Sequence, residues 1–177
     1  ESIIQNMKEN KKNNNSSEIS IKTPKKKIWP RTNGQAKFIK EILNKEIIFV
    51  IGPAGTGKTF ISVSHAVSML TSGFVDKIII SRPAVEAGEK LGFLPGDLKE
   101  KIDPYLRPIY DSLDENLPKD NVAKLIEKQK IEIAPIAYLR GRTLNNSYII
   151  LDEAQNTSPV QMKMFLTRFG ENSRMVI

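Results

Sequence analysis

The chain has 177 residues, 40% of them hydrophobic, which is enough for one core-forming domain and a tail. The absence of cysteine excludes disulfides, thiolate metal sites and a cysteine nucleophile, and a single histidine excludes a histidine-rich metal site. No apolar run approaches the roughly 20 residues of a membrane-spanning helix, so we expect a cytoplasmic protein with no membrane partner.

The formal net charge of +7 is concentrated at the N-terminus, because residues 1–31 carry eight basic and three acidic side chains. A basic arm of this kind can hold phosphate backbones. We favour a solvated linker instead, since no aromatic residue interleaves the charges before Trp29. The prediction is therefore a mostly disordered segment over 1–30, in which only residues 19–22 indicate a short edge strand, followed by one folded domain over 31–177.

A helix is predicted from Gln35 to Leu43, with Asn33 as its N-cap and Phe38, Ile39 and Leu43 on its apolar face. Gln35 has the amide donor and acceptor that a protein needs to recognise adenine. A solvent-facing glutamine is the alternative.

Residues 47–51 form an apolar, largely β-branched run that predicts a buried parallel strand. The next eight residues match G-x-x-x-x-G-K-[ST] at every fixed position, and they are Gly52, Pro53, Ala54, Gly55, Thr56, Gly57, Lys58 and Thr59. The glycines let backbone N–H groups curl around phosphates, and the following helix adds its positive N-terminal end. We predict that Lys58 holds the β- and γ-phosphates of a nucleotide and that Thr59 ligates Mg²⁺.

The elements after this loop predict an α/β sheet with parallel strands. A helix to about Leu70 and an apolar strand over 77–81 imply a right-handed crossover. Further helices are expected over 98–113, bent or restarted at Pro104 and Pro108, and over 121–129, with a strand over 131–134.

Three arginines lie in loops that follow predicted strands. Arg82 leaves the strand over 77–81, while Arg140 and Arg142 lie in a second basic loop. Open α/β sheets bind ligands at the carboxyl ends of their strands. These arginines are therefore candidates for contact with an RNA backbone or with the nucleotide of a neighbouring subunit, and salt bridges within the loops are the alternative.

An apolar strand over 148–151 ends in Asp152 and Glu153. After a phosphate-binding loop, this pattern predicts that Asp152 holds Mg²⁺ through water and that Glu153 polarises the attacking water as a catalytic residue. Gln155 follows at a position from which it can touch the γ-phosphate or that water.

A capping box is predicted at Ser158 and Gln161, with Pro159 in the first turn of a helix that runs to about Phe169. Val160, Met164 and Phe165 are expected to face inward, and a last strand begins at Arg174.

Taken together, these motifs resemble the ATPase domain of the PhoH-like family, a branch of P-loop ATPases related to superfamily-one helicases. The resemblance covers roughly residues 30–177 and rests on GPAGTGKT (52–59), SRPAVEAGEKLGFLPGDLKEKIDPYLRPIYDSL (81–113), IAPIAYLRGRT (133–143) and IILDEAQNTSPVQMKMFLTRFG (149–170). The second block is the most particular, because the other motifs recur in many unrelated ATPases. The family pattern continues beyond Ile177 with a polar motif and a later basic segment, so we expect the C-terminal part of the domain to be missing.

The resemblance implies an α/β P-loop NTPase fold in which a mostly parallel sheet is flanked by helices. It implies that Gln35 contacts adenine, that Lys58 and Thr59 serve the phosphates and Mg²⁺, and that Asp152 and Glu153 serve the metal and the water. It further implies ATP and Mg²⁺ as cofactors, RNA as a partner, and a homo-oligomer, with a hexameric ring as one form, in the full-length protein.

The leading expectation is an ATPase that couples hydrolysis to RNA binding or remodelling. The alternative is a nucleotide-dependent regulatory switch with little turnover, although the intact Glu153 favours hydrolysis. A kinase acting on a small molecule is a third reading, and no acceptor-activating acid or lid motif supports it.

Overall fold

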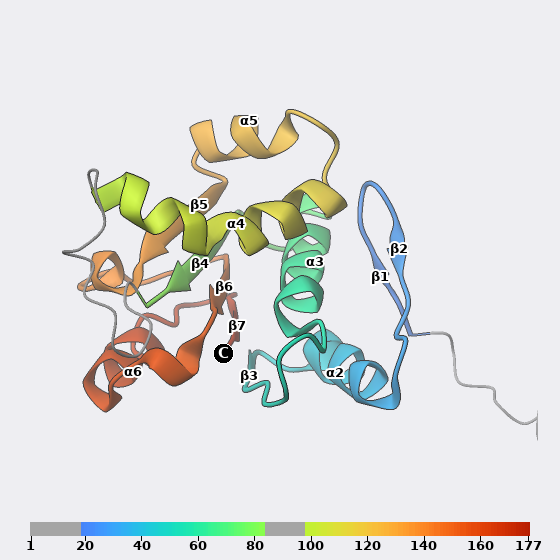
Figure 1. Cartoon of the computed structure of the whole chain (residues 1–177), viewed down its shortest axis with the longest axis horizontal. Helices are drawn as coiled ribbons and strands as arrows, with labels where there is room; N and C mark the ends of the chain where they lie inside the picture. Colours follow the sequence, from blue (N-terminus) through green and yellow to red (C-terminus); the bar gives the residue numbers. More distant parts are fainter. Residues whose placement is uncertain (1–18, 84–97) are drawn as a thin grey trace, which may run out of the picture.

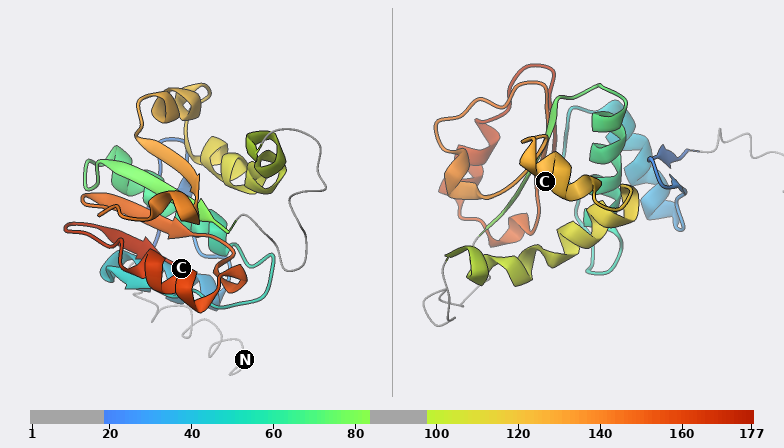
Figure 2. Two further views of the ribbon diagram at one scale, coloured as in Figure 1. Left: turned by 90° about the vertical axis from the view of Figure 1, so that its left-hand side faces the viewer. Right: turned by 90° about the horizontal axis from the view of Figure 1, so that it is seen from above.

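The computed structural model describes residues 19–83 and 98–177, whose central element is a sheet with helices on both faces (Figures 1 and 2). Five strands lie in the order β3-β7-β6-β4-β5, and every neighbouring pair is parallel. Their bounds are β3 (Ile47–Ile48), β4 (Lys77–Arg82), β5 (Ile131–Pro135), β6 (Ser147–Leu151) and β7 (Arg174–Val176). This confirms the predicted α/β class and its mostly parallel sheet.

Two groups of helices cover the two faces of the sheet. One face carries α2 (Asn33–Asn44), α3 (Lys58–Thr71), α4 (Leu98–Asn116) and α5 (Asn121–Glu127). The other face carries α6 (Pro159–Leu166) and the 3₁₀ turn η2 (Ile136–Leu139), while a second such turn, η3 (Ala154–Asn156), follows β6. None of the described helices is long and apolar enough to cross a membrane.

The alternation of side chains along the central strands explains the two cores. On β4, Ile78 and Ile80 pack with α3 and α4, whereas Ile79 packs with α6 and η2. On β6, Ile150 lies in the core with α3 and α4, whereas Ile149 lies in the core with α6 and η2. Because successive strand residues point to opposite faces, continuous isoleucine runs suit a sheet that is buried on both sides.

The prediction of a buried strand over 47–51 is wrong in extent and in burial. Only Ile47 and Ile48 pair with β7, and the exposed fractions are 42% for Ile47, 57% for Phe49 and 96% for Ile51. Within the described part of the chain, β3 has a strand neighbour on one side only. Among the described residues, the apolar run therefore lies at an edge of the sheet and several of its side chains are exposed, although their pattern is that of an interior strand.

Two helices differ from prediction in which residues they bury. Thr32, not Asn33, is the N-cap of α2, and its hydroxyl accepts from the Gln35 N–H. The buried face of α2 consequently includes Ile42, which is 1% exposed, whereas Leu43 is 42% exposed. In α6, the predicted capping box at Ser158 and Gln161 is confirmed, but Val160 lies in the first turn and is 78% exposed.

The helix was predicted to be bent or restarted at Pro104 and Pro108, and it does not restart, because α4 runs through both positions as one helix. Each interior proline removes a hydrogen bond and costs about 3 kcal/mol. Burial of Ile109, Leu113 and Leu117 in the core that α4 shares with α3 offsets that cost.

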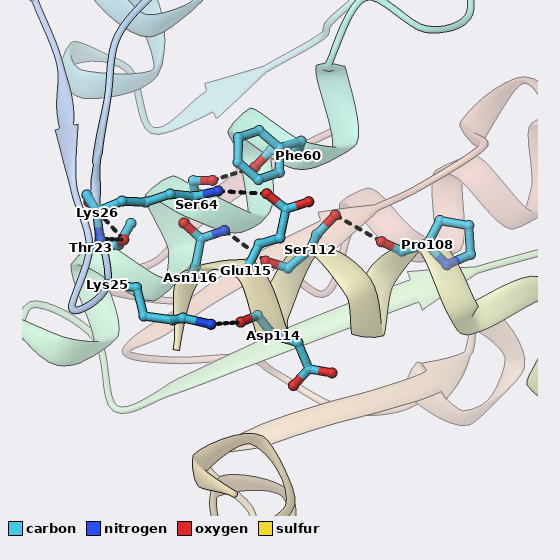
Figure 3. A network of polar contacts seen from close by, with 10 residues as sticks. All are labelled: Thr23, Lys25, Lys26, Phe60, Ser64, Pro108, Ser112, Asp114, Glu115 and Asn116. Atoms are coloured by element: carbon cyan, nitrogen blue, oxygen red, sulfur yellow. Dashed lines mark hydrogen bonds and ion pairs between the residues drawn. The ribbon is translucent and has the colours of Figure 1, made fainter. Parts of the chain in front are cut away.

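An N-terminal hairpin, made of β1 (Ile21–Lys22) and β2 (Lys27–Ile28), lies beside α3 and the end of α4 (Figures 1 and 3). The hairpin confirms the short strand that the alternation over 19–22 predicted. Residues 19–30 belong to the described structure, whereas residues 1–18, which share the expectation of disorder, lie outside it. The Lys25 ammonium donates to the Asp114 carbonyl at 2.7 Å, and that of Lys26 pairs with Glu115 at 2.5 Å. Both lysines contact another part of the folded chain, which supports a structural role for this part of the basic arm.

Candidate functional site

The glycine-rich loop over 52–57 joins β3 to α3 and is shaped by two left-handed glycines. Gly55 has φ +74° and Gly57 has φ +86°, and Gly57 is also the N-cap of α3. Lys58, the first residue of α3, folds back so that its ammonium donates to the carbonyls of Gly52 and Pro53, both at 2.8 Å. The loop therefore has the three features that the sequence predicted, which are a glycine turn, a helix N-terminus and the ammonium group of Lys58.

The acidic residues after β6 lie next to this loop. The Thr59 hydroxyl donates to Asp152 Oδ1 at 2.8 Å, joining residues 93 apart in the sequence. Burial raises the pKa of Asp152, while the Thr59 hydrogen bond and the charge of Arg82 oppose this rise. Glu153 is next in the chain, and its carboxylate accepts a hydrogen bond from the side chain of Gln155. The predicted metal ligands are thus in contact, and Glu153 and Gln155 lie beside them.

Gln35 reaches the same loop from α2. Its side-chain nitrogen donates to the Thr56 carbonyl at 3.0 Å, and its side-chain oxygen accepts from the Arg31 N–H at 2.8 Å. A Cβ at Gly57 would lie 3.2 Å from the Gln35 nitrogen, so this approach favours glycine at position 57. Gln35 therefore lies at the site, where its described partners are backbone groups, and its contact with adenine stays a prediction.

Arg82 faces the acids rather than solvent. Its guanidinium lies 3.6 Å from Asp152 Oδ2 and 3.9 Å from Glu153 Oε1. Sequence reasoning placed Arg82 at this edge but missed these partners. Part of the signal was available, because Arg82 and Asp152 each come at the carboxyl end of a predicted parallel strand, but the order of the strands was not predicted.

Arg140 and Arg142 lie in the loop after η2. Arg142 makes two parallel hydrogen bonds to Glu132, at 2.6 and 2.7 Å. These bonds lower the pKa of Glu132 and raise that of Arg142. Arg140 is exposed. Arg142 thus has a partner on β5 within the chain, and contact of either arginine with RNA or a neighbouring subunit stays a prediction.

The donors at this site fit Mg²⁺ bound together with a nucleotide. Thr59 and Asp152 offer hydroxyl and carboxylate oxygens, the ligand type that Mg²⁺ prefers. Among the described residues, no three His, Cys, Asp or Glu side chains are grouped as a metal cage. Mg²⁺ suits such a sparse site, because it keeps several waters and takes ligands from the phosphates.

Comparison with known proteins assigns the chain to a family. The family model described as "PhoH-like protein" matches residues 27–177. The chain is 57% identical over 160 residues to the "PhoH-like protein" of Bacillus subtilis, covering 90% of this chain and 50% of that protein. It is 54% identical to the "PhoH-like protein" of Synechocystis sp., covering 85% and 46% of the two chains. It is 48% identical to "Protein PhoH" of Escherichia coli K12, covering 85% and 43%.

The chain therefore spans about half the length of these curated relatives. The matched region includes the glycine-rich loop, Arg82 and the acids after β6. This chain belongs to the PhoH-like protein family.

Proposed function

We propose that this chain binds ATP with Mg²⁺ at the loop over 52–59 and hydrolyses it. The observation that carries the proposal is the Thr59–Asp152 hydrogen bond at 2.8 Å. This bond joins the phosphate-binding motif to the acidic motif, and Glu153 follows immediately. The acidic motif, which is a weak signal alone, lies beside a glycine-rich motif that matches at every fixed position, as hydrolysis requires.

Each residue has a chemical task in this proposal. The loop N–H groups and the N-terminus of α3 hold the phosphates, and Lys58 exchanges its two carbonyl partners for phosphate oxygens. Bound Mg²⁺ neutralises charge on the phosphates. Glu153 accepts a proton from the water that attacks the γ-phosphorus, and ADP leaves as the bond to the bridging oxygen breaks. Gln155 holds the Glu153 carboxylate in place through its hydrogen bond.

The full-length protein is proposed to couple this hydrolysis to RNA, within a homo-oligomer. This part rests on family membership and on the exposed Arg140 in the basic loop after η2. The alternative is a nucleotide-dependent switch with little turnover. In that case nucleotide binding would change the conformation without a matching rate of phosphate release.

The test compares wild type with Lys58→Ala in the full-length protein. Calorimetry with Mg²⁺ and ATP should show binding to wild type and none to the variant, because backbone N–H groups alone do not replace a full charge beside the phosphates. Lys128→Ala, which removes an exposed cation at the C-terminal end of α5, is the matched control and should bind normally.

Phosphate release with and without single-stranded RNA then separates the two functions. Stimulation of turnover by RNA supports the coupled ATPase, whereas binding without turnover in either condition supports the switch. Equal ATP affinity in wild type and Lys58→Ala would refute the proposed site.

A further inference from the structure

Arg82 is brought to the acids by the register of two neighbouring strands. Ser81 on β4 pairs with Leu151 on β6, and the Asp152 N–H donates to the Ser81 carbonyl at 2.9 Å. Arg82 and Asp152 are the next residues along their strands. They lie on the same face as Ile80 and Ile150, which pack towards α3. The side chains consequently meet at the carboxyl edge, below the glycine-rich loop.

The burial of this cluster limits where the guanidinium can act. The side chains of Arg82 and Asp152 are 11% and 10% exposed, and that of Glu153 is 37% exposed. Reaching another molecule would require Arg82 to leave two carboxylates, one of them buried. Removing one partner of a buried ion pair leaves an uncompensated charge, which is strongly unfavourable. In this structure Arg82 contacts carboxylates of its own chain, and its contact with RNA or with a neighbouring subunit stays a prediction.

Both carboxylate oxygens of Asp152 are already engaged. Thr59 donates to Oδ1, and the Arg82 guanidinium lies beside Oδ2. An incoming Mg²⁺ would meet a second cation on the carboxylate that it needs, and like charges at this range repel. Occupation of the metal site and the present position of Arg82 are therefore in competition.

We propose that Arg82 is a positioning residue that acts as the internal counter-ion of Asp152 and Glu153 in the absence of Mg²⁺, and that releases Asp152 when the metal arrives with the nucleotide. The counter-ion role stands on the contacts alone. The release rests on the proposed function, since it requires Mg²⁺ and a nucleotide at this site. Arg82 ends β4, so its release couples the occupation of the metal site to the end of that strand.

A double-mutant cycle without nucleotide, in the full-length protein with chelator present, tests the counter-ion role. The cycle compares Arg82→Gln, Asp152→Asn and the double variant by chemical denaturation. In wild type, Arg82→Gln should cause a loss of stability, measured as a higher unfolding equilibrium constant. In the Asp152→Asn background, the same substitution should change the unfolding equilibrium constant by a factor about tenfold smaller, which is a typical coupling between residues in contact. Arg82→Lys should recover part of the loss because it keeps the charge.

Arg142→Gln is the matched control for this cycle. It also breaks an arginine–carboxylate pair, with Glu132, at a place where Asp152 takes no part. Its effect should add to that of Asp152→Asn without coupling. Equal losses for Arg82→Gln in both backgrounds would overturn the counter-ion role, whatever the protein does with ATP.

The release is tested by the Mg²⁺ dependence of ATP binding. Without the competing guanidinium, the half-saturating Mg²⁺ concentration should fall about threefold or more in Arg82→Gln, while maximal turnover falls because Glu153 loses its neighbour. An unchanged or higher half-saturating concentration would overturn the release. A turnover whose dependence on protein concentration changes in Arg82→Gln would show that Arg82 acts between subunits and would overturn the proposal. If wild type binds no ATP, the proposed function fails, and the denaturation cycle still decides the counter-ion role.

Discussion

Glu153 occupies a strained backbone position between β6 and η3. Its φ is +52°, in the left-handed region that non-glycine residues rarely adopt. Such positions cost about 1–3 kcal/mol and persist where the surroundings fix them, often at functional sites. Here the turn sends the Glu153 carboxylate towards Arg82 and Gln155. The backbone geometry therefore agrees with a carboxylate that is held in place for chemistry.

Glu153→Gln should separate binding from hydrolysis. The amide keeps the shape and hydrogen bonding of the side chain but cannot accept a proton from water. ATP should remain bound while turnover falls by about 10²-fold or more. Steady-state phosphate release and calorimetric affinity measure the two effects in the full-length protein. Glu171→Gln, at an exposed position, is the control, and equal turnover in Glu153→Gln and wild type would remove the water-activating role.

At the scale of elements, the N-terminal hairpin contacts both α3 and α4. Ile21 is 1% exposed and packs with Ile39 of α2 and Ile61 of α3. The Lys26 ammonium lies 4.9 Å from the centre of the Phe60 ring, beside the first turn of α3, and pairs with Glu115 of α4 (Figure 3). The hairpin thus supports the helix that begins at the end of the glycine-rich loop.

Ile21→Ala should lower the free energy of unfolding by about 2–4 kcal/mol, because it removes buried volume from this small cluster. Lys26→Ala should cost about 1 kcal/mol or less, since its ion pair is largely exposed. Urea denaturation measures both. Lys22→Ala changes an exposed residue in the same hairpin and should have little effect. A loss for Ile21→Ala no larger than that for Lys22→Ala would mean that the hairpin does not support the fold.

The elements that the sequence predicted well are those with local signals. The apolar run of β4, the capping box at Ser158 and the spacing of the glycine-rich loop each lie within a few neighbouring residues. Only the first strand of the N-terminal hairpin was predicted, because the polar contacts of the hairpin are distant, with Lys26 and Glu115 lying 89 residues apart. The burial of β3 was misjudged for a related reason, since an edge strand and an interior strand have the same apolar pattern.

At the candidate site, too, local signals were predicted and contacts between distant residues were not. Lys58, Thr59 and Asp152 follow from motif spacing, and the structure brings Thr59 and Asp152 together. The partners of Arg82 depend on which strands are neighbours, and the order of strands cannot be read from local pattern. A sequence can therefore predict the members of such a site more readily than the pairing among them.

At the scale of the whole molecule, a buried polar pair ties α3 to the centre of the sheet. His65 Nδ1 lies 2.8 Å from the Tyr148 hydroxyl, and both side chains are buried. Burial, with a smaller contribution from the charge of Arg174, lowers the pKa of His65 from 6.5 to about 4. Folding therefore keeps His65 neutral at pH values where the unfolded chain would protonate it.

This pKa difference makes stability depend on pH. Between about pH 6.5 and pH 4, the unfolded chain binds the His65 proton and the folded chain does not, so unfolding becomes easier as pH falls. Once the pH is below both pKa values, this group has lowered the free energy of unfolding by about 3 kcal/mol. In His65→Gln, the free energy of unfolding should decline less steeply between pH 7 and pH 4. Equal slopes in the variant and wild type would show that other groups set the acid sensitivity.

The pairing of β3 with β7 also sets an order for folding. β3 carries the glycine-rich loop and is made early in synthesis, whereas its only strand partner in the described structure is built from residues 174–176. Contacts so distant in sequence form late, because closing a long segment costs entropy before the contact repays it. During synthesis, the hairpin and α3 can pack as soon as they emerge, but the strand that anchors the loop must wait for β7. The glycine-rich loop is therefore anchored through β3 only after residues 174–176 have been made and paired.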